Sequence, residues 1–176
     1  MIVSVERIKE LVNLAGWTDA KIEMKLKAIE QTIRSYTHNN FQNRSCRRAA
    51  DIVGGLFMVD ALAPFNVGDT IQITESALND GLYVVTSADD STFTVDGDVK
   101  DEDFVLVTKV EYPADVLDCV VNLMEWEVNF RGKVGIQSET LSRHSVTYFN
   151  QDANNHVNGY PASLLGCLRP YKKVRF

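Results

Sequence analysis

Acidic residues form the densest group of side chains in the sequence that could bind a metal ion. Five of them lie within eight residues: Asp96, Asp98, Asp101, Glu102 and Asp103. Calcium favours such oxygen ligands, but its binding loop needs a glycine at the sixth position and a glutamate at the twelfth, and neither spacing is present. We therefore expect a solvated turn here, with a weak cation site as the alternative.

Catalytic motifs are missing from the sequence. The three histidines, His38, His144 and His156, lie in separate polar stretches without the short spacing of a metal site. The chain has no GxxxxGK[ST] or GxGxxG loop to hold a phosphate, and no GxSxG turn to present a nucleophile. We therefore expect a protein that is not an enzyme and that uses no metal and no cofactor.

The C-terminal residues combine positive charge with aromatic rings. We expect Pro170 to stop a short helix that opens at Tyr160, and we expect the residues after it to be extended and accessible. We predict that this arm docks onto a partner protein by strand addition or aromatic anchors; a frayed terminus or a nucleic-acid contact are the alternatives. The arm consists of Arg169, Pro170, Tyr171, Lys172, Lys173, Val174, Arg175 and Phe176.

Three arginines form a second group of positive charges. Arg44, Arg47 and Arg48 lie between a predicted helix and an acidic segment. They could neutralise Asp51 or the acidic segment, or they could face a DNA channel. The sequence alone leaves both roles open.

Charge also divides the chain into regions. Residues 52–110 contain 11 acidic and two basic residues, whereas the other 117 residues contain 13 acidic and 16 basic ones. The net charge of −6 argues against indiscriminate nucleic-acid binding. The cysteines, Cys46, Cys119 and Cys167, include no CxxC pair and are expected to be reduced thiols. No apolar run is long enough for a membrane span, so we expect no membrane contact.

Helical spacing dominates the two flanking regions. Ser4 and Thr18 are expected N-caps of two helices, and the second helix carries one apolar stripe that ends near His38. Pro113 opens the most apolar helix of the chain, which we expect to be the central core helix. The apolar stripe consists of Ile22, Leu26, Ile29, Ile33 and Tyr36.

The middle region instead contains short β-branched runs separated by turn residues. Its five candidate strands are 55–59, 70–74, 82–85, 92–95 and 104–107. The predicted fold class is therefore α+β. A helical-bundle frame, 1–51 and 111–176, has about four helices plus a hairpin or extended arm, and 52–110 form an inserted small antiparallel β domain, an open barrel or a sandwich.

Two stretches of the flanking regions resemble a known family. Residues 135–148, GIQSETLSRHSVTY, are similar to a G-x-x-S-E-x-x-G/S-x-x-S-x-x-Y stretch, and residues 164–171, LLGCLRPY, resemble a hydrophobic-L-x-x-x-R/K ending. The head–tail connector (adaptor, or head-completion) proteins of long-tailed bacteriophages commonly show the first stretch after their longest helix and the second at their end. The likeness covers 1–51 and 111–176, whereas 52–110 depart from the pattern as an insertion.

The resemblance implies a structural virion protein of the phage neck, assembled in the host cytoplasm. Such proteins form a ring, typically of twelve subunits, beneath the portal protein, where they extend the DNA channel, pass packaged DNA and dock a stopper or tail-completion protein. Carried over by position, the arm from Arg169 to Phe176 would reach the portal. The contacts with neighbouring subunits or the next neck ring would come from Ser138, Glu139, Ser142, Arg143, Ser145 and Tyr148.

Two other functions remain as alternatives. A nucleic-acid-binding or regulatory module of a phage or prophage is suggested by Arg44, Arg47, Arg48 and the C-terminal cations. An enzyme would have to use the carboxylates of the middle region, for which the sequence shows no paired arrangement.

Overall fold

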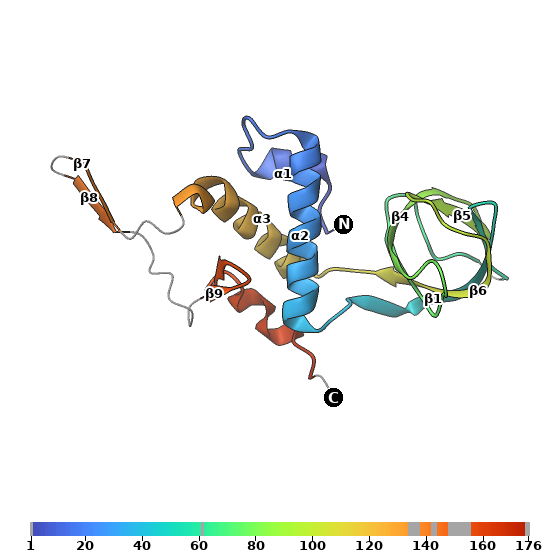
Figure 1. Ribbon diagram of the computed structural model, residues 1–176. Coiled ribbons are helices and arrows are strands. Elements are labelled where there is room, and N and C mark those ends of the chain that lie inside the picture. Colours follow the sequence, from blue (N-terminus) through green and yellow to red (C-terminus); the bar gives the residue numbers. More distant parts are fainter. Residues whose placement is uncertain (1, 61, 134–137, 142–143, 148–155, 175–176) are drawn as a thin grey trace. The chain divides into compact units, whose positions relative to one another are not determined.

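The chain is divided between two units in the computed structural model, which describes residues 2–60, 62–133, 138–141, 144–147 and 156–174 (Figure 1). The helical unit consists of Ile2–Asn39 and Pro113–Phe176, and the barrel unit consists of Asn40–Tyr112. The chain therefore leaves the helical unit after its second helix and returns to it at Pro113.

The helices of the helical unit begin where capping residues predict. Helix α1 (Val5–Leu11) is capped by the Ser4 hydroxyl, which accepts a hydrogen bond from the Arg7 N–H at 3.2 Å. Helix α2 (Asp19–Thr37) begins after Thr18 and ends at His38, whose φ of 50° stops the helix. The predicted stripe on α2 is confirmed for Ile22, Leu26, Ile29 and Ile33, which are buried.

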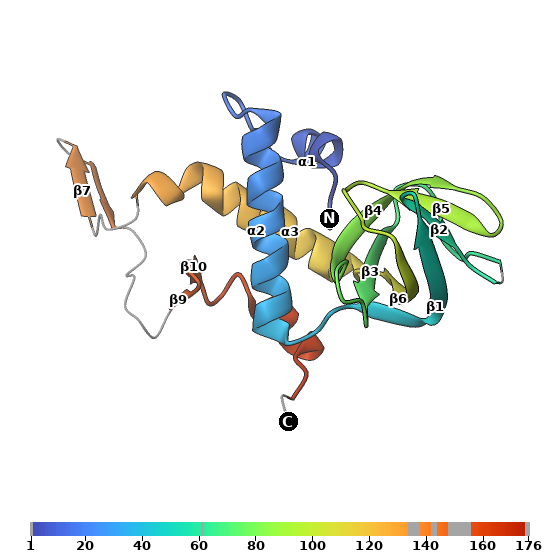
Figure 2. The same ribbon diagram turned by 45° about the vertical axis from the view of Figure 1, so that its right-hand side comes forward.

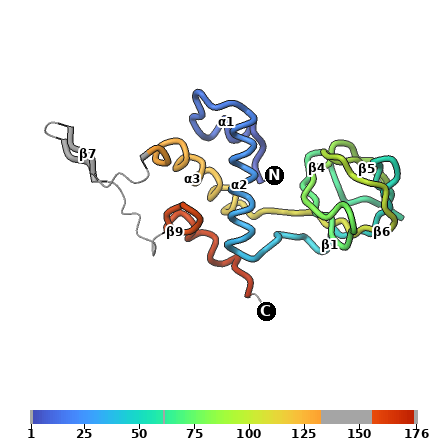
Figure 3. Tube along the Cα trace, viewed as in Figure 1, coloured from blue at the N-terminus to red at the C-terminus, as the bar shows by residue number. Residues whose placement is uncertain are grey.

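Helix α3 (Ala114–Asn129) follows Pro113 as predicted and packs against α2 and the C-terminal segment (Figure 3). A short 3-10 turn, η1 (Arg131–Lys133), follows it. The hairpin of β7 (Ser138–Leu141) and β8 (His144–Thr147) comes next in the chain. The end of the described chain holds the two-residue strands β9 (His156–Val157) and β10 (Tyr160–Pro161) and the 3-10 helix η3 (Gly166–Tyr171).

Six antiparallel strands close the barrel unit in the order β1-β2-β5-β4-β3-β6 (Figure 2). Closure depends on β6, which is hydrogen-bonded to β1 on one side and to β3 on the other. The strands are β1 (Gln42–Val53), β2 (Leu56–Met58), β3 (Thr70–Thr74), β4 (Gly81–Ala88), β5 (Thr92–Val95) and β6 (Glu102–Val110).

The barrel has a hydrophobic core of its own. Alternate residues point inward, and the Phe93 ring stacks on Phe57 at 4.6 Å and meets the edge of Phe65 at 5.0 Å between ring centroids. The buried core residues are Ala50, Ile52, Phe57, Val59, Phe65, Ile71, Ile73, Val85, Phe93, Val105 and Val107.

The predicted fold class, an α+β helical-bundle frame of about four helices with a small inserted β domain, is wrong. Strands make up about 30% of the chain, and six of them close into a barrel, whereas an open barrel or a sandwich was the prediction. The physical reason is β1, which starts at Gln42, well before the expected boundary at Ile52, and supplies the partner that β2 and β6 need. A closed sheet with its own core is a unit in its own right.

Candidate interaction surfaces

The C-terminal segment is bound to the helical unit. The Tyr171 hydroxyl donates a hydrogen bond to the Asp115 carboxylate, with both oxygens at 2.7 Å, and this bond raises the pKa of Tyr171. The Asn39 side-chain amide donates to the Tyr171 carbonyl at 3.3 Å. The Lys173 N–H donates to the Thr37 carbonyl at 2.8 Å, at the end of α2. Hydrogen bonds therefore attach Tyr171 and Lys173 to the helical unit.

The prediction of an extended arm beginning at Arg169 is therefore wrong, although the predicted accessibility holds for Arg169, Pro170, Lys172 and Lys173, whose side chains are exposed. Residues Gly166–Tyr171 form a 3-10 helix that contains Pro170, and buried Leu165 and Leu168 attach it to the unit. Lys172 lies over the Tyr36 ring, with its Nζ 3.8 Å from the ring centroid. Val174 is 76% exposed, and Arg175 and Phe176 lie outside the described residues. The side chains of Lys173 and Val174 are exposed, so a partner can reach them although the Lys173 backbone is bonded to the end of α2.

An ion cluster around buried Glu127 joins α2, α3 and the backbone at Gly159. The Glu127 carboxylate is 1% exposed and lies 3.0 Å from the Lys25 Nζ and 3.5 Å from an Arg131 guanidinium nitrogen. Arg131 also donates to the Gly159 carbonyl at 2.9 Å. Burial and a hydrogen bond with Glu127 raise the pKa of Tyr160. Each charged group of the cluster is in an ion pair within the helical unit, so we assign the cluster to stability.

The three arginines belong to β1 and have different environments. Between Asn43 and Arg47 the register of β1 against β6 shifts, and Arg44 lies in this bulge with an exposed side chain. The Arg47 guanidinium donates to the Thr108 hydroxyl at 2.9 Å and to the Gln42 side chain at 3.2 Å. Two of these arginines are thus half-buried, and Arg44 is the one that faces solvent.

Arg48 also bonds to neutral acceptors inside the barrel unit. Its guanidinium donates to the Leu62 carbonyl at 3.3 Å and to the Arg47 carbonyl at 2.8 Å. Asp51, the expected partner of the arginines, instead accepts a hydrogen bond from the Phe104 N–H at 2.9 Å. Two arginines therefore hold the strands and the loop after β2, and a DNA-facing role for the three stays a prediction.

Residues expected at subunit contacts fall in the β7–β8 hairpin or outside the described residues. Ser138 pairs with Thr147, and Leu141 pairs with His144. Ser138 and Glu139 lie on β7, and Ser145 lies on β8. Ser142, Arg143 and Tyr148 lie outside the described residues. The structure thus brings three of the six into one two-stranded sheet.

The carboxylates of the acidic cluster bond to separate donors rather than facing one another. Asp96 accepts a hydrogen bond from the Val84 N–H. Asp101 accepts from the Gly54 N–H at 2.7 Å, and Asp98 pairs with Lys100 at 2.7 Å. These three carboxylates lie in the exposed turn between β5 and β6, as we expected for a solvated turn.

Glu102 organises the loop after β3. Its carboxylate accepts hydrogen bonds from the Ser76 hydroxyl, from the Ala77 N–H at 2.6 Å and from the Asn79 side chain at 2.8 Å. Ser76 contributes most to the lowered pKa of Glu102, followed by the Ala77 N–H. Because these donors favour the ionised carboxylate, the loop depends on the charge of Glu102.

The barrel has an exposed apolar surface that the sequence analysis did not predict. Its residues, Val53, Leu56, Met58 and Phe104, are called the Phe104 patch below. Gly54 and Gly55, both at positive φ, form the tight turn between β1 and β2. This turn sets Val53 opposite Leu56, and the register sets Asp51 opposite Met58.

Phe104 occupies a strained position. The pairs Ala50–Val105 and Ile52–Glu102 leave Asp103 and Phe104 together opposite Asp51, which is a β-bulge. Phe104 has a φ of 56°, a left-handed conformation that costs an L-residue about 1–2 kcal/mol. Its side chain is 62% exposed. The bulge therefore turns a phenylalanine toward solvent, a signal that appears only once the strand register is known.

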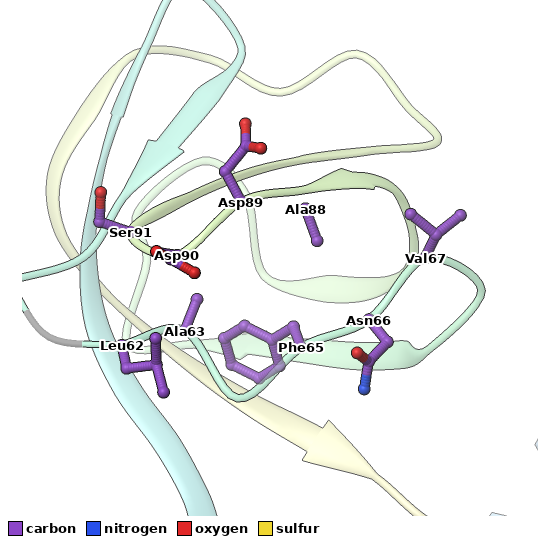
Figure 4. Close-up of a pocket in the computed structure, with 9 residues that line it drawn as sticks. All are labelled: Leu62, Ala63, Phe65, Asn66, Val67, Ala88, Asp89, Asp90 and Ser91. Carbon is purple, nitrogen blue, oxygen red and sulfur yellow. The ribbon is translucent and has the colours of Figure 1, made fainter.

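A groove of about 640 Å³ lies between the loop after β2 and the β4–β5 turn (Figure 4). Figure 4 shows the Phe65 ring on one side and Asp89 and Asp90 across from it. Asp89 and Asp90 are the charged residues among the described residues that line the groove, and both are exposed. A site for a small ligand usually has a buried polar group that orients the ligand, and these lining residues provide none. Its other lining residues are Leu62, Ala63, Asn66, Val67, Ala88 and Ser91.

Two of the cysteines, Cys119 and Cys167, bond to the same carbonyl group in the helical unit. The thiols of Cys119 in α3 and Cys167 in η3 each lie 3.5 Å from the Leu164 carbonyl oxygen. Burial, followed by a hydrogen bond with Cys167, raises the pKa of the Cys119 thiol. Cys167 is exposed, so the two thiols differ in access to solvent.

No known protein family matches the chain, and no curated protein is significantly similar to it in sequence. Within the described ranges, no group of three or more His, Cys, Asp or Glu side chains could hold a metal ion. No helix in the described part of the chain is long and apolar enough to span a membrane. Function therefore has to be inferred from the surfaces above.

Proposed function

We propose that the chain is a structural protein of the bacteriophage neck. It would act as a head–tail connector that forms a ring under the portal, extends the DNA channel and docks the stopper or tail. The β7–β8 hairpin carries this proposal, because it lies in the segment that resembles the connector stretch. Within the described residues, its strands pair only with each other.

An isolated two-stranded hairpin is marginally stable in water, so a further strand or a packing partner is expected. A neighbouring subunit in a ring can supply that strand by edge addition. Three of the residues expected at subunit contacts, Ser138, Glu139 and Ser145, lie in this hairpin. The hairpin is therefore the proposed subunit contact.

The charge of the barrel unit supports a position outside the DNA channel. Asn40–Tyr112 contain 13 acidic and five basic residues, and this charge repels phosphates. The portal contact is assigned to the helical unit, because the segment expected as a portal-docking arm is bonded within that unit as far as Lys173.

A nucleic-acid-binding module is the second candidate, and exposed Arg44 is the observation that favours it. Phosphate contacts strengthen steeply as salt falls, so this function requires DNA binding at low salt that Arg44→Ala weakens. The acidic barrel disfavours it.

Co-sedimentation with portal-bearing, tail-less capsids tests the connector function. We expect saturable binding with a fixed number of chains per capsid, and capsids without portal serve as the control. Thr140→Pro removes a donor from β7 and should reduce the number of bound chains, whereas Thr86→Ser on the barrel should not. Wild-type protein that stays in the supernatant would contradict the proposal.

A further inference from the structure

The Phe104 patch combines two features that are unfavourable for an isolated protein. Phe104 is held at a left-handed φ and is 62% exposed, the largest exposure of a phenylalanine in the described residues. Val53, Leu56 and Met58 are also exposed: Val53 pairs with Leu56, and Met58 lies opposite Asp51, the β1 residue that the Phe104 bulge also faces. Strained residues and clustered apolar side chains both mark binding surfaces.

Carboxylates lie in and around this patch, and in the strand register Asp51 is between Met58 and Phe104. Asp51 is bonded to the Phe104 N–H, and Asp101 is bonded to Gly54 at the tip of the β1–β2 hairpin. Asp103 is exposed and precedes Phe104 in the chain. The nearest lysine in sequence, Lys100, is already paired with Asp98. A partner for this surface must therefore combine apolar side chains with positive charge.

Residues 172–176 of this chain have that chemistry. Residues 172–176 contain three basic and no acidic residues, and Lys173 and Arg175 alternate with Val174 and Phe176. In an extended segment this alternation places the two apolar side chains on one face. Val174 is the most exposed large hydrophobic residue in the described part of the chain.

We propose that the Phe104 patch binds the C-terminal segment Lys173–Phe176 of a second copy of this chain. Val174 and Phe176 cover the patch, while the long side chains of Lys173 and Arg175 reach the carboxylates at its border. The contact joins two different surfaces, so repetition produces a ring or an open chain. It adds a second subunit contact to the proposed connector, but it can be tested without the capsid.

Two full-length variants, each lacking one side of the contact, test the proposal. Phe104→Ser removes the largest side chain of the patch and leaves the segment Lys173–Phe176 unchanged, and the double variant Val174→Ser, Phe176→Ser does the reverse. We expect wild-type protein to self-associate with rising concentration in sedimentation velocity, and each variant to remain monomeric. A mixture of the two variants should form a one-to-one dimer, because each supplies the side that the other lacks.

Leu82→Ser is the matched control, since Leu82 is exposed on β4 rather than in the patch. It should self-associate as the wild type does. Raised salt should weaken association, by about tenfold or more in Kd if both cations pair with carboxylates. A synthetic peptide of residues 171–176 should compete, and a scrambled peptide should not.

Several results would overturn the inference. A wild-type protein that stays monomeric at low salt would do so, including the case in which the segment docks on its own barrel. A Phe104→Ser variant that associates normally, or a mixture that forms no dimer, would also contradict it. Capsid binding without self-association would refute this contact alone, whereas self-association without capsid binding would refute the connector function alone.

Discussion

Replacing Phe104 with glycine and with alanine tests the left-handed bulge on β6. In an ordinary strand, glycine is less stable than alanine by roughly 0.5–1 kcal/mol, because it loses more freedom on folding. At a φ of 56° the order should reverse, since alanine keeps the Cβ atom and with it a penalty of about 1–2 kcal/mol. We expect the Phe104→Gly variant to be more stable than Phe104→Ala by about 0.5–1 kcal/mol.

Hydrogen exchange of the β6 amides measures this difference for the barrel alone. The amides should exchange about two- to fivefold more slowly in Phe104→Gly than in Phe104→Ala. Leu82 on β4 is the control, because its φ is not positive, and there alanine should be the more stable replacement. If glycine were less stable than alanine at both positions, the argument from strain would be refuted.

Three further predictions concern ionisable groups. Iodoacetamide should label exposed Cys167 and spare Cys119, whose thiol pKa is raised by burial; equal labelling by mass spectrometry would contradict this. The pKa of Glu102 is lowered in the folded protein, so its contribution to stability is present above the ordinary carboxyl pKa and is lost as pH falls through the lowered value. Hydrogen exchange of the loop after β3 should therefore accelerate in acid, and Glu102→Gln should remove this dependence. Glu127→Ala should lower the free energy of unfolding by about 2–3 kcal/mol in urea titrations followed by tryptophan fluorescence, because it leaves two cations without their partner. Glu125→Ala, an exposed change on the same helix, should have little effect.

Local signals were sufficient for much of the secondary structure. The caps at Ser4 and Thr18, the stripe on α2 and the Pro-led α3 were predicted, because each depends on residues within one or two turns. Strands β3 and β5 match the predicted ranges, since their side chains alternate and turn residues bound them. These features need no distant partner.

Long-range pairing was the part that the sequence did not reveal. The first half of β1, Gln42–Arg48, is polar and contains a bulge, so it shows no alternation. It becomes a strand because β6 pairs with it, about 60 residues later in the chain. Barrel closure depends on that pairing, which is why an open insert was expected.

The candidate surfaces also divide into features that depend on neighbouring residues, which were predicted, and features that depend on distant residues, which were not. The positive charge of the C-terminal segment was evident, but its attachment depends on Asp115, Thr37 and Asn39, which are distant in sequence. Pro170 suggested a stop, yet a 3-10 helix accommodates it. Phe104 looked like an ordinary strand residue, because its φ is set by the register of β6 against β1.

The strain at Phe104 and the charge of the barrel lead to one interpretation. A glycine at this position would remove both the left-handed penalty and the exposed ring, so folding alone gives no reason for phenylalanine. Binding does, because the bulge holds the ring outward before a partner arrives and so reduces the entropy lost on docking. The carboxylates at the border then select a basic partner, and Lys173 and Arg175 are basic residues beside apolar ones in the same chain. Salt therefore separates the two contributions. Raised salt should weaken the ionic part and leave the apolar part, so Asp103→Asn should reduce the salt dependence of self-association while Phe104→Ser abolishes the association itself.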